Sequence, residues 1–108
     1  MNAVDLPFTS TTTSAGGAPL VQSFVLKNRH GLHTRPCVLL ARALEPYRCR
    51  VMVECNGQTA DASSILGLLT LAAGYDSKLT FTVTGREAAA AMRRIANLFE
   101  THFREAYD

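Results

Sequence analysis

The chain has 108 residues and a mass of 11.7 kDa, which is the size of one ordinary globular domain. Hydrophobic residues make up 47% and charged residues 19%, too apolar for a disordered chain and too polar for a membrane bundle. The net charge of +2 is small for a nucleic-acid binder, and the longest mostly apolar stretch, residues 65–74, is far shorter than the roughly 20 residues that span a bilayer. We therefore expect neither nucleic acid nor a membrane as a partner.

Cysteine usage and the first residues indicate a cytoplasmic protein. Cys37, Cys49 and Cys55 are odd in number and lack CxxC spacing, so they predict buried thiols of a reducing compartment and no metal site. The first 20 residues contain no Lys or Arg and no continuous apolar core, so we expect no secretory signal. Residues 1–19 are rich in Thr, Ser, Gly and Ala without periodicity, which predicts a flexible tail before a folded domain over residues 20–108.

The first half of that domain predicts a strand, a helix and a hairpin. Residues 21–27 (VQSFVLK) are typical of a strand, and a helix begins near Thr34, which is an acceptable N-cap, with Pro36 in its first turn. Pro46 ends that helix. Residues 50–55 alternate as a strand does, and Asn56-Gly57 is a strong hairpin signal that makes residues 58–62 the partner strand.

The second half predicts two helices around one strand. Ser63 and Ser64 precede a short apolar helix that Gly74 closes. Residues 78–84 (KLTFTVT) alternate strictly between apolar side chains and threonine, and residues 86–103 form a long amphipathic helix. We interpret His102, in its last turn, as a cap or a surface residue. The order β-α-β-β-α-β-α predicts an α+β fold, a four-stranded antiparallel sheet with three helices on one face.

His33 is the strongest candidate for chemistry, because it directly precedes a helix N-terminus. The unsatisfied amides there form an anion site, and Arg35 adds a planar cation that suits phosphate oxygens. An imidazole nucleophile beside such a cradle is what phosphoryl capture on histidine requires. Spacing alone does not separate this function from that of a solvated loop histidine.

The segment HGLHTRP, followed by a helix, resembles the active-site signature of the histidine-containing phosphocarrier (HPr) family of the phosphotransferase system. The segments ECNGQTADA, ASSILGLLTLAAG and KLTFTVTG and the closing helix also fall where that family has them, so the resemblance covers residues 21–103. It implies an HPr-like open-faced β-sandwich. The nitrogen-type branch (NPr), whose output is regulatory, is an alternative, because TVTGREAAAAMRRIANLFE also resembles that branch.

The resemblance implies a role for particular residues. His33 would accept a phosphoryl group through Nδ1 from enzyme I, which phosphoenolpyruvate charges, and pass it to IIA-type proteins, while Arg35 steadies the group. The protein would be a carrier without turnover of its own, a monomer that uses no cofactor and no metal. Ser64 falls on the family's regulatory serine, which HPr kinase/phosphorylase phosphorylates, although both Ser64 and Ser63 suit a plain N-cap.

Partner binding requires an exposed apolar patch with a cationic rim. The candidates are Leu32, Thr34, Ile65, Leu66 and Leu69 for the patch, of which some must fill the core, and Arg35, Arg42 and Arg48 for the rim.

Two residues differ from the family pattern, and two interpretations other than a carrier remain open. His30 stands where the family often has a small polar residue, and Cys37 stands where it has alanine. A pure binding module is the non-carrier alternative, with His30 and His33 as half of a metal site. A weaker one is nucleic-acid binding through the arginines Arg42, Arg48, Arg50, Arg93 and Arg94.

Overall fold

The structure is a computed structural model that describes residues 18–107. The expected flexible tail, residues 1–19, therefore lies outside the described residues except for its last two positions. The elements follow the predicted order β-α-β-β-α-β-α and add a 3-10 turn, η1, near the C-terminus. They are β1 (Leu20–Val25), α1 (Thr34–Leu44), β2 (Arg50–Cys55), β3 (Gln58–Asp61), α2 (Ile65–Thr70), β4 (Lys78–Thr84), α3 (Ala88–Glu100) and η1 (Arg104–Tyr107).

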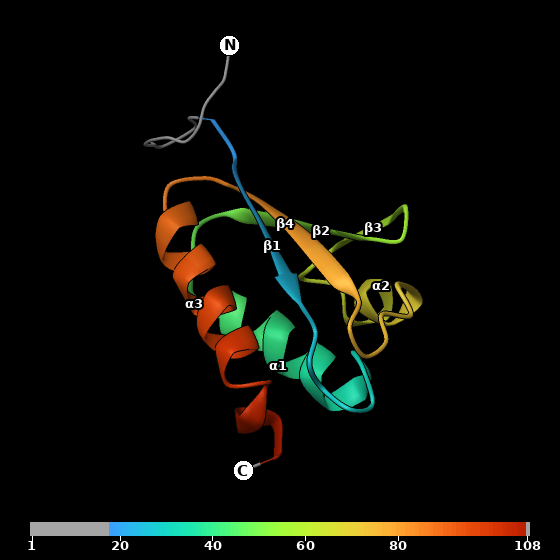
Figure 1. The fold of residues 1–108 in the computed structure, drawn as a ribbon. Helices are drawn as coiled ribbons and strands as arrows, with labels where there is room; N and C mark the ends of the chain where they lie inside the picture. Colours follow the sequence, from blue (N-terminus) through green and yellow to red (C-terminus); the bar gives the residue numbers. More distant parts are fainter. Residues whose placement is uncertain (1–17, 108) are drawn as a thin grey trace.

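The four strands form one antiparallel sheet in the order β1-β4-β2-β3, so β4 lies between the first strand and the hairpin. Partners directly opposite each other point to the same face, and the alternation in β4 therefore sets both faces of the sheet. Leu79, Phe81 and Val83 are buried, whereas the threonines between them are half-buried. The helices cover the buried face (Figure 1). The predicted α+β fold, with three helices on one face of a four-stranded antiparallel sheet, is confirmed.

Four phenylalanines join the sheet to α3 and to the chain beyond it. The ring of Phe99 lies 4.9 Å from Phe24, 5.6 Å from Phe81 and 5.0 Å from Phe103, measured between centroids. Phe81 and Phe103 are fully buried. Burial of one such ring stabilises the fold by about 1.5–3 kcal/mol, so this cluster fixes α3 on the sheet and directs the residues that follow it.

Contacts between distant segments move several element ends from their predicted positions. The first strand ends at Val25, not at residue 27, because the backbone of Leu26 bonds to residues 76 and 77 in a loop. The last helix begins at Ala88, not at residue 86. Before it, Glu87 donates its backbone N–H to the Arg48 carbonyl, and its carboxylate accepts from the Arg48 N–H.

The same helix ends at Glu100 instead of residue 103. Thr101 is its C-cap, while His102 and Phe103 adopt φ values of 55° and 57° that no helix contains. His102 is therefore an exposed surface residue and not the cap. The turn is held because the Phe103 N–H donates to the Leu98 carbonyl over 2.8 Å.

Three further boundaries differ from the prediction. His33, not Thr34, is the N-cap of α1, and Thr34 is its first helical residue. The strand predicted over residues 58–62 ends at Asp61, because the chain turns there and the Asp61 carbonyl accepts the Ser64 N–H over 2.9 Å. The short helix ends at Thr70, well before Gly74, since Ala72 adopts a φ of 50°.

Candidate functional site

Backbone bonds to the loop after α2 hold the loop between β1 and α1 that carries His33. The Leu32 N–H donates to the Ala73 carbonyl over 2.8 Å. Gly31 has a φ of +73°, and a Cβ there would lie 2.5 Å from the Ala73 oxygen and 2.9 Å from the Gly74 Cα. Both the backbone angle and the close approach require glycine. The two loops therefore support each other directly behind the histidine.

His33 is the N-cap residue of α1 and is half-buried. Its backbone is extended, and its carbonyl accepts the Cys37 N–H over 2.9 Å. Within residues 18–107 the imidazole makes no hydrogen bond to the first amides of its own helix, so these donors remain directed at the site. The helix end carries about half a positive charge, and the exposed Arg35 adds a full one. The geometry and the charge at this point suit a phosphoryl group.

Two further aromatic rings lie beside His33. The Tyr107 hydroxyl is 3.0 Å from Nε2 of His33, and the Tyr107 ring centroid is 5.6 Å from Cζ of Arg35. The ring of His30 lies 6.1 Å from that of His33, edge to face. Tyr107 could not be predicted from the sequence, since it is 74 residues away from His33 and no local pattern connects the two.

The C-terminal turn that carries Tyr107 is anchored on both sides. Arg94 of α3 makes a bidentate ion pair with Glu105, with N–O distances of 2.8 and 2.9 Å. The hydrogen bonds from Arg94 lower the pKa of the Glu105 carboxyl. Asn28, in the loop before His33, donates its side-chain N–H to the His102 carbonyl over 2.8 Å. Together with the buried Phe103, these contacts pack η1 against α1.

Ser64 is the N-cap of α2, and its neighbour is not. The Ser64 Oγ accepts the Gly67 N–H over 3.0 Å. Ser63 instead donates both its N–H and its hydroxyl to the Asp61 carboxylate, at 2.8 and 2.7 Å, and these bonds lower the pKa of Asp61. Both serines are exposed. Ser64 therefore combines the capping role with access to solvent.

The residues expected to bind partners differ in exposure. Leu32 is 4% exposed and belongs to the hydrophobic core, which leaves little of its side chain for a partner. Ile65 and Leu69 are half-buried and pack against that core, and Thr34 is exposed. Leu66 is 76% exposed and presents the most apolar surface of this group. The helix that carries these apolar residues, α2, packs against α1.

The expected cationic rim is exposed on and beyond α1. Arg35 and Arg42 are two turns apart on that helix, a spacing that places them on one face, and Arg48 follows after its end. All three guanidinium groups belong to exposed residues.

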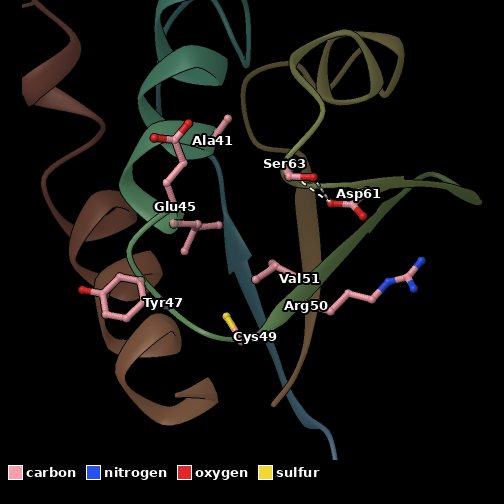
Figure 2. Close-up of a pocket in the computed structure, with 9 residues that line it drawn as sticks. Ala41, Glu45, Tyr47, Cys49, Arg50, Val51, Asp61 and Ser63 are labelled. Carbon is pink, nitrogen blue, oxygen red and sulfur yellow. Dashed lines mark hydrogen bonds between the residues drawn. The ribbon is translucent and has the colours of Figure 1, made fainter. Parts of the chain in front are cut away.

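A separate cleft of about 250 Å³ lies at the other end of α1, between this helix and β2 (Figure 2). Ala41, Leu44 and Val51 give it an apolar lining, and Glu45, Arg50 and Asp61 add charge. His33 and Arg35 are not among its lining residues. Within residues 18–107, no three His, Cys, Asp or Glu side chains come together as a metal site would require.

The comparisons with known proteins agree on one family. A model of the PTS-HPr family, described as the PTS HPr component phosphorylation site, matches residues 20–101. The chain is 33% identical to the phosphocarrier protein HPr of Treponema pallidum over 86 residues, which are 80% of this chain and 98% of that protein. It is 28% identical to the HPr of Chlamydia muridarum over 76% of this chain and 79% of that one.

Solved structures give the same result. A crystal structure of the phosphocarrier protein HPr from Bacillus anthracis superimposes with a TM-score of 0.72 and 28% identity, covering 77% of this chain and 99% of that one. An HPr dimer from Thermoanaerobacter tengcongensis is also similar, with a TM-score of 0.63 and 22% identity, covering 89% of this chain and 98% of that one.

The fold and the histidine at a helix N-terminus define a small phosphocarrier of the phosphotransferase system. The chain belongs to the PTS-HPr family. Among the helices within residues 18–107, none is long and apolar enough to cross a membrane.

Proposed function

We propose that His33 accepts a phosphoryl group from enzyme I, charged by phosphoenolpyruvate, and transfers it to IIA-type proteins. The observation that carries this proposal is the position of His33 at the N-cap of α1, two residues before the exposed Arg35. Nδ1 attacks the phosphorus, and the helix amides and Arg35 offset the charge on the phosphoryl oxygens. The protein holds the group covalently between two partners and has no turnover of its own.

The test is to incubate the protein with enzyme I and labelled phosphoenolpyruvate and to map the label by mass spectrometry without acid treatment. We expect an acid-labile phosphate on His33. His33→Ala should lose it, whereas His30→Ala and His102→Ala, which remove exposed histidines, should keep it. Label on another residue would contradict the proposal. So would an unlabelled protein with an enzyme I that charges another HPr.

Arg35 is the residue that we expect to bind the phosphoryl oxygens. Arg35→Ala should slow phosphoryl transfer by on the order of 100-fold, because one charged donor to the transferring group is lost. Thermal stability should change little, since the side chain is exposed. Arg93→Ala, which removes an exposed guanidinium of α3, is the matched control and should transfer normally. A large loss of stability in Arg35→Ala with normal transfer would make the residue structural.

We further propose that Ser64 is a site of regulatory phosphorylation by HPr kinase/phosphorylase, and that Ile65, Leu66, Leu69 and Thr34 belong to the partner surface. Exposure of Ser64 at the start of α2 supports this, because a phosphate there adds almost two negative charges next to apolar side chains that a partner must cover. Leu32 contributes as a buried support of the loop.

Ser64→Asp should weaken binding to enzyme I, whereas Ser63→Asp, one residue away, should weaken it less because Ser63 is turned to Asp61. Leu66→Ser should also weaken binding, since it removes the most exposed apolar side chain of the surface. The measurement is the affinity for enzyme I by titration calorimetry. Equal affinities for the wild type, Ser64→Asp and Leu66→Ser would contradict this assignment.

The acceptor separates a sugar-type carrier from the nitrogen-type branch. The phosphorylated protein should be offered IIA proteins of both branches in parallel, and the rate of label transfer measured for each. A faster transfer to the nitrogen-type acceptor would assign the chain to NPr.

A further inference from the structure

A side chain 74 positions after His33 in the chain contacts its imidazole. Tyr107 in η1 contacts both members of the proposed phosphoryl site, His33 through its hydroxyl and Arg35 through its aromatic ring. The hydroxyl lies 3.0 Å from Nε2, a normal hydrogen-bond distance. The contact is therefore made to the ring nitrogen that is not expected to attack phosphorus.

The protonation of the imidazole follows from its surroundings. A neutral imidazole carries one proton, so the partner of one ring nitrogen decides the state of the other. Nδ1 is bonded to Cγ and lies nearer than Nε2 to the backbone of His33, where the first amides of α1 point outward as donors. A proton on Nδ1 would face these donors, whereas a lone pair there would face positive charge. This arrangement favours a proton on Nε2, the ring nitrogen that the Tyr107 hydroxyl contacts.

We propose that Tyr107 is a positioning residue for phosphoryl transfer, an inference that rests on the proposed function of His33. Its hydroxyl accepts the Nε2–H of His33 and so keeps the lone pair on Nδ1, the atom that attacks. Its ring holds the Arg35 guanidinium, whose Cζ is 5.6 Å from the ring centroid, beside the same imidazole. One side chain thus orders the nucleophile and the cation together.

During transfer the Nδ1 lone pair of His33 forms a bond, and the Nε2 proton stays in place. The lone pair of Nδ1 forms the new N–P bond, and the bond between phosphorus and the donor breaks, with its electron pair left on the donor. Nε2 keeps its proton while the ring gains positive charge, so the hydrogen bond from Nε2 to the Tyr107 oxygen becomes charge-assisted and stronger. Tyr107 itself neither gains nor loses a proton.

The contact is supported from outside the site, which is what a positioning role needs. The ion pair between Arg94 and Glu105 ties η1 to α3, and the buried Phe103 fixes the preceding turn in the core. Tyr107 is itself 49% exposed, so it does not enclose the site in the core.

The first test measures the tautomer directly. In the ¹⁵N-labelled full chain without any phosphoryl donor, long-range ¹H–¹⁵N correlations should show a protonated Nε2 and an unprotonated Nδ1 for His33. Tyr107→Phe should give a mixture of the two tautomers. Tyr47→Phe, which removes a hydroxyl from a half-buried tyrosine at the other end of α1, should match the wild type. A wild type with the proton on Nδ1, or a Tyr107→Phe spectrum equal to that of the wild type, overturns the proposal.

The second test measures transfer from enzyme I. Tyr107→Phe should accept the phosphoryl group about 3- to 10-fold more slowly, the loss expected for one hydrogen bond. Tyr107→Leu should be slower still, because it also releases Arg35. In an Arg35→Ala background the two variants should become equal. Unchanged rates in Tyr107→Phe overturn the role of the hydroxyl, and a persistent difference in that background overturns the role of the ring.

The outcomes distinguish a failure of the Tyr107 proposal from a failure of the proposed function. A wild type that takes no label on His33 overturns the proposed function whatever the tautomer. A wild type that is labelled on His33 but carries its proton on Nδ1 overturns the role of Tyr107 alone.

Discussion

Replacing Gly31 tests whether the contact between the two loops holds the histidine site. In Gly31→Ala the new Cβ would lie 2.5 Å from the Ala73 oxygen and 2.9 Å from the Gly74 Cα, both backbone atoms that cannot move alone. The φ of +73° costs an alanine about 1 to 2 kcal/mol, and relief of the overlap costs about 1 to 3 kcal/mol more. We therefore expect the free energy of unfolding to fall by about 2 to 5 kcal/mol.

The matched control is Gly57→Ala, in the hairpin turn between β2 and β3. Gly57 has a similar φ of +82°, but a Cβ there would meet nothing within 4 Å, so only the backbone cost of about 1 to 2 kcal/mol remains. Urea unfolding followed by circular dichroism gives both free energies. Phosphoryl acceptance at a temperature where both variants are folded should fall in Gly31→Ala only. Equal destabilisation by the two substitutions would refute the claim that loop contact constrains this position.

Three further outcomes follow from the surroundings of individual groups. Burial raises the pKa of Cys37 to about 11, so iodoacetamide at pH 8 should modify Cys49 first, and mass spectrometry that finds Cys37 labelled first would contradict this. The hydrogen bonds from Arg94 lower the pKa of Glu105, so this pair stabilises the fold above the ordinary glutamate pKa and the stabilisation is lost as the pH falls through the lowered value. When the free energy of unfolding is measured against pH, the Glu105→Gln variant should therefore show a smaller decline at acidic pH than the wild type. Ser64→Ala should cost about 1 kcal/mol in urea unfolding because it removes the cap of α2, and an unchanged midpoint would exclude the cap.

The sequence predicted the strands well where apolar and polar side chains alternate without interruption. The strict alternation of β4 and the Asn56-Gly57 turn depend on neighbours in the chain, and both are as predicted. Helix ends were less predictable, because long-range contacts decide them. Phe103 continues the apolar stripe of α3 in the sequence, but its burial against Phe99 and the bond from Asn28 to the His102 carbonyl turn the chain out of the helix.

The candidate site was predictable only in part. His33 and Arg35 are two positions apart in one motif at a helix start, so their proximity follows from the sequence. The burial of Leu32 depends on its bond to Ala73, some 40 residues away, and the contact of Tyr107 depends on the packing of η1 against α1. A repeating pattern of apolar residues along the chain predicts neither contact, because each joins residues far apart in the sequence. Sequence patterns therefore predicted the candidate residues of the site, while the contacts that support these residues could be found only in the fold.

The central position of β4 also bears on the order in which the fold assembles. The β2–β3 hairpin closes between residues close in the chain, but β1 pairs only with β4, more than fifty residues later. Pairing across such a separation must offset a large loop-closure entropy and is slow compared with hairpin formation. During synthesis, β1 therefore waits for residues 78–84 before it has a partner. The loop behind His33 and the turn that carries Tyr107 are completed after that step, so His33 acquires its surroundings only after residues 78–107 have been made.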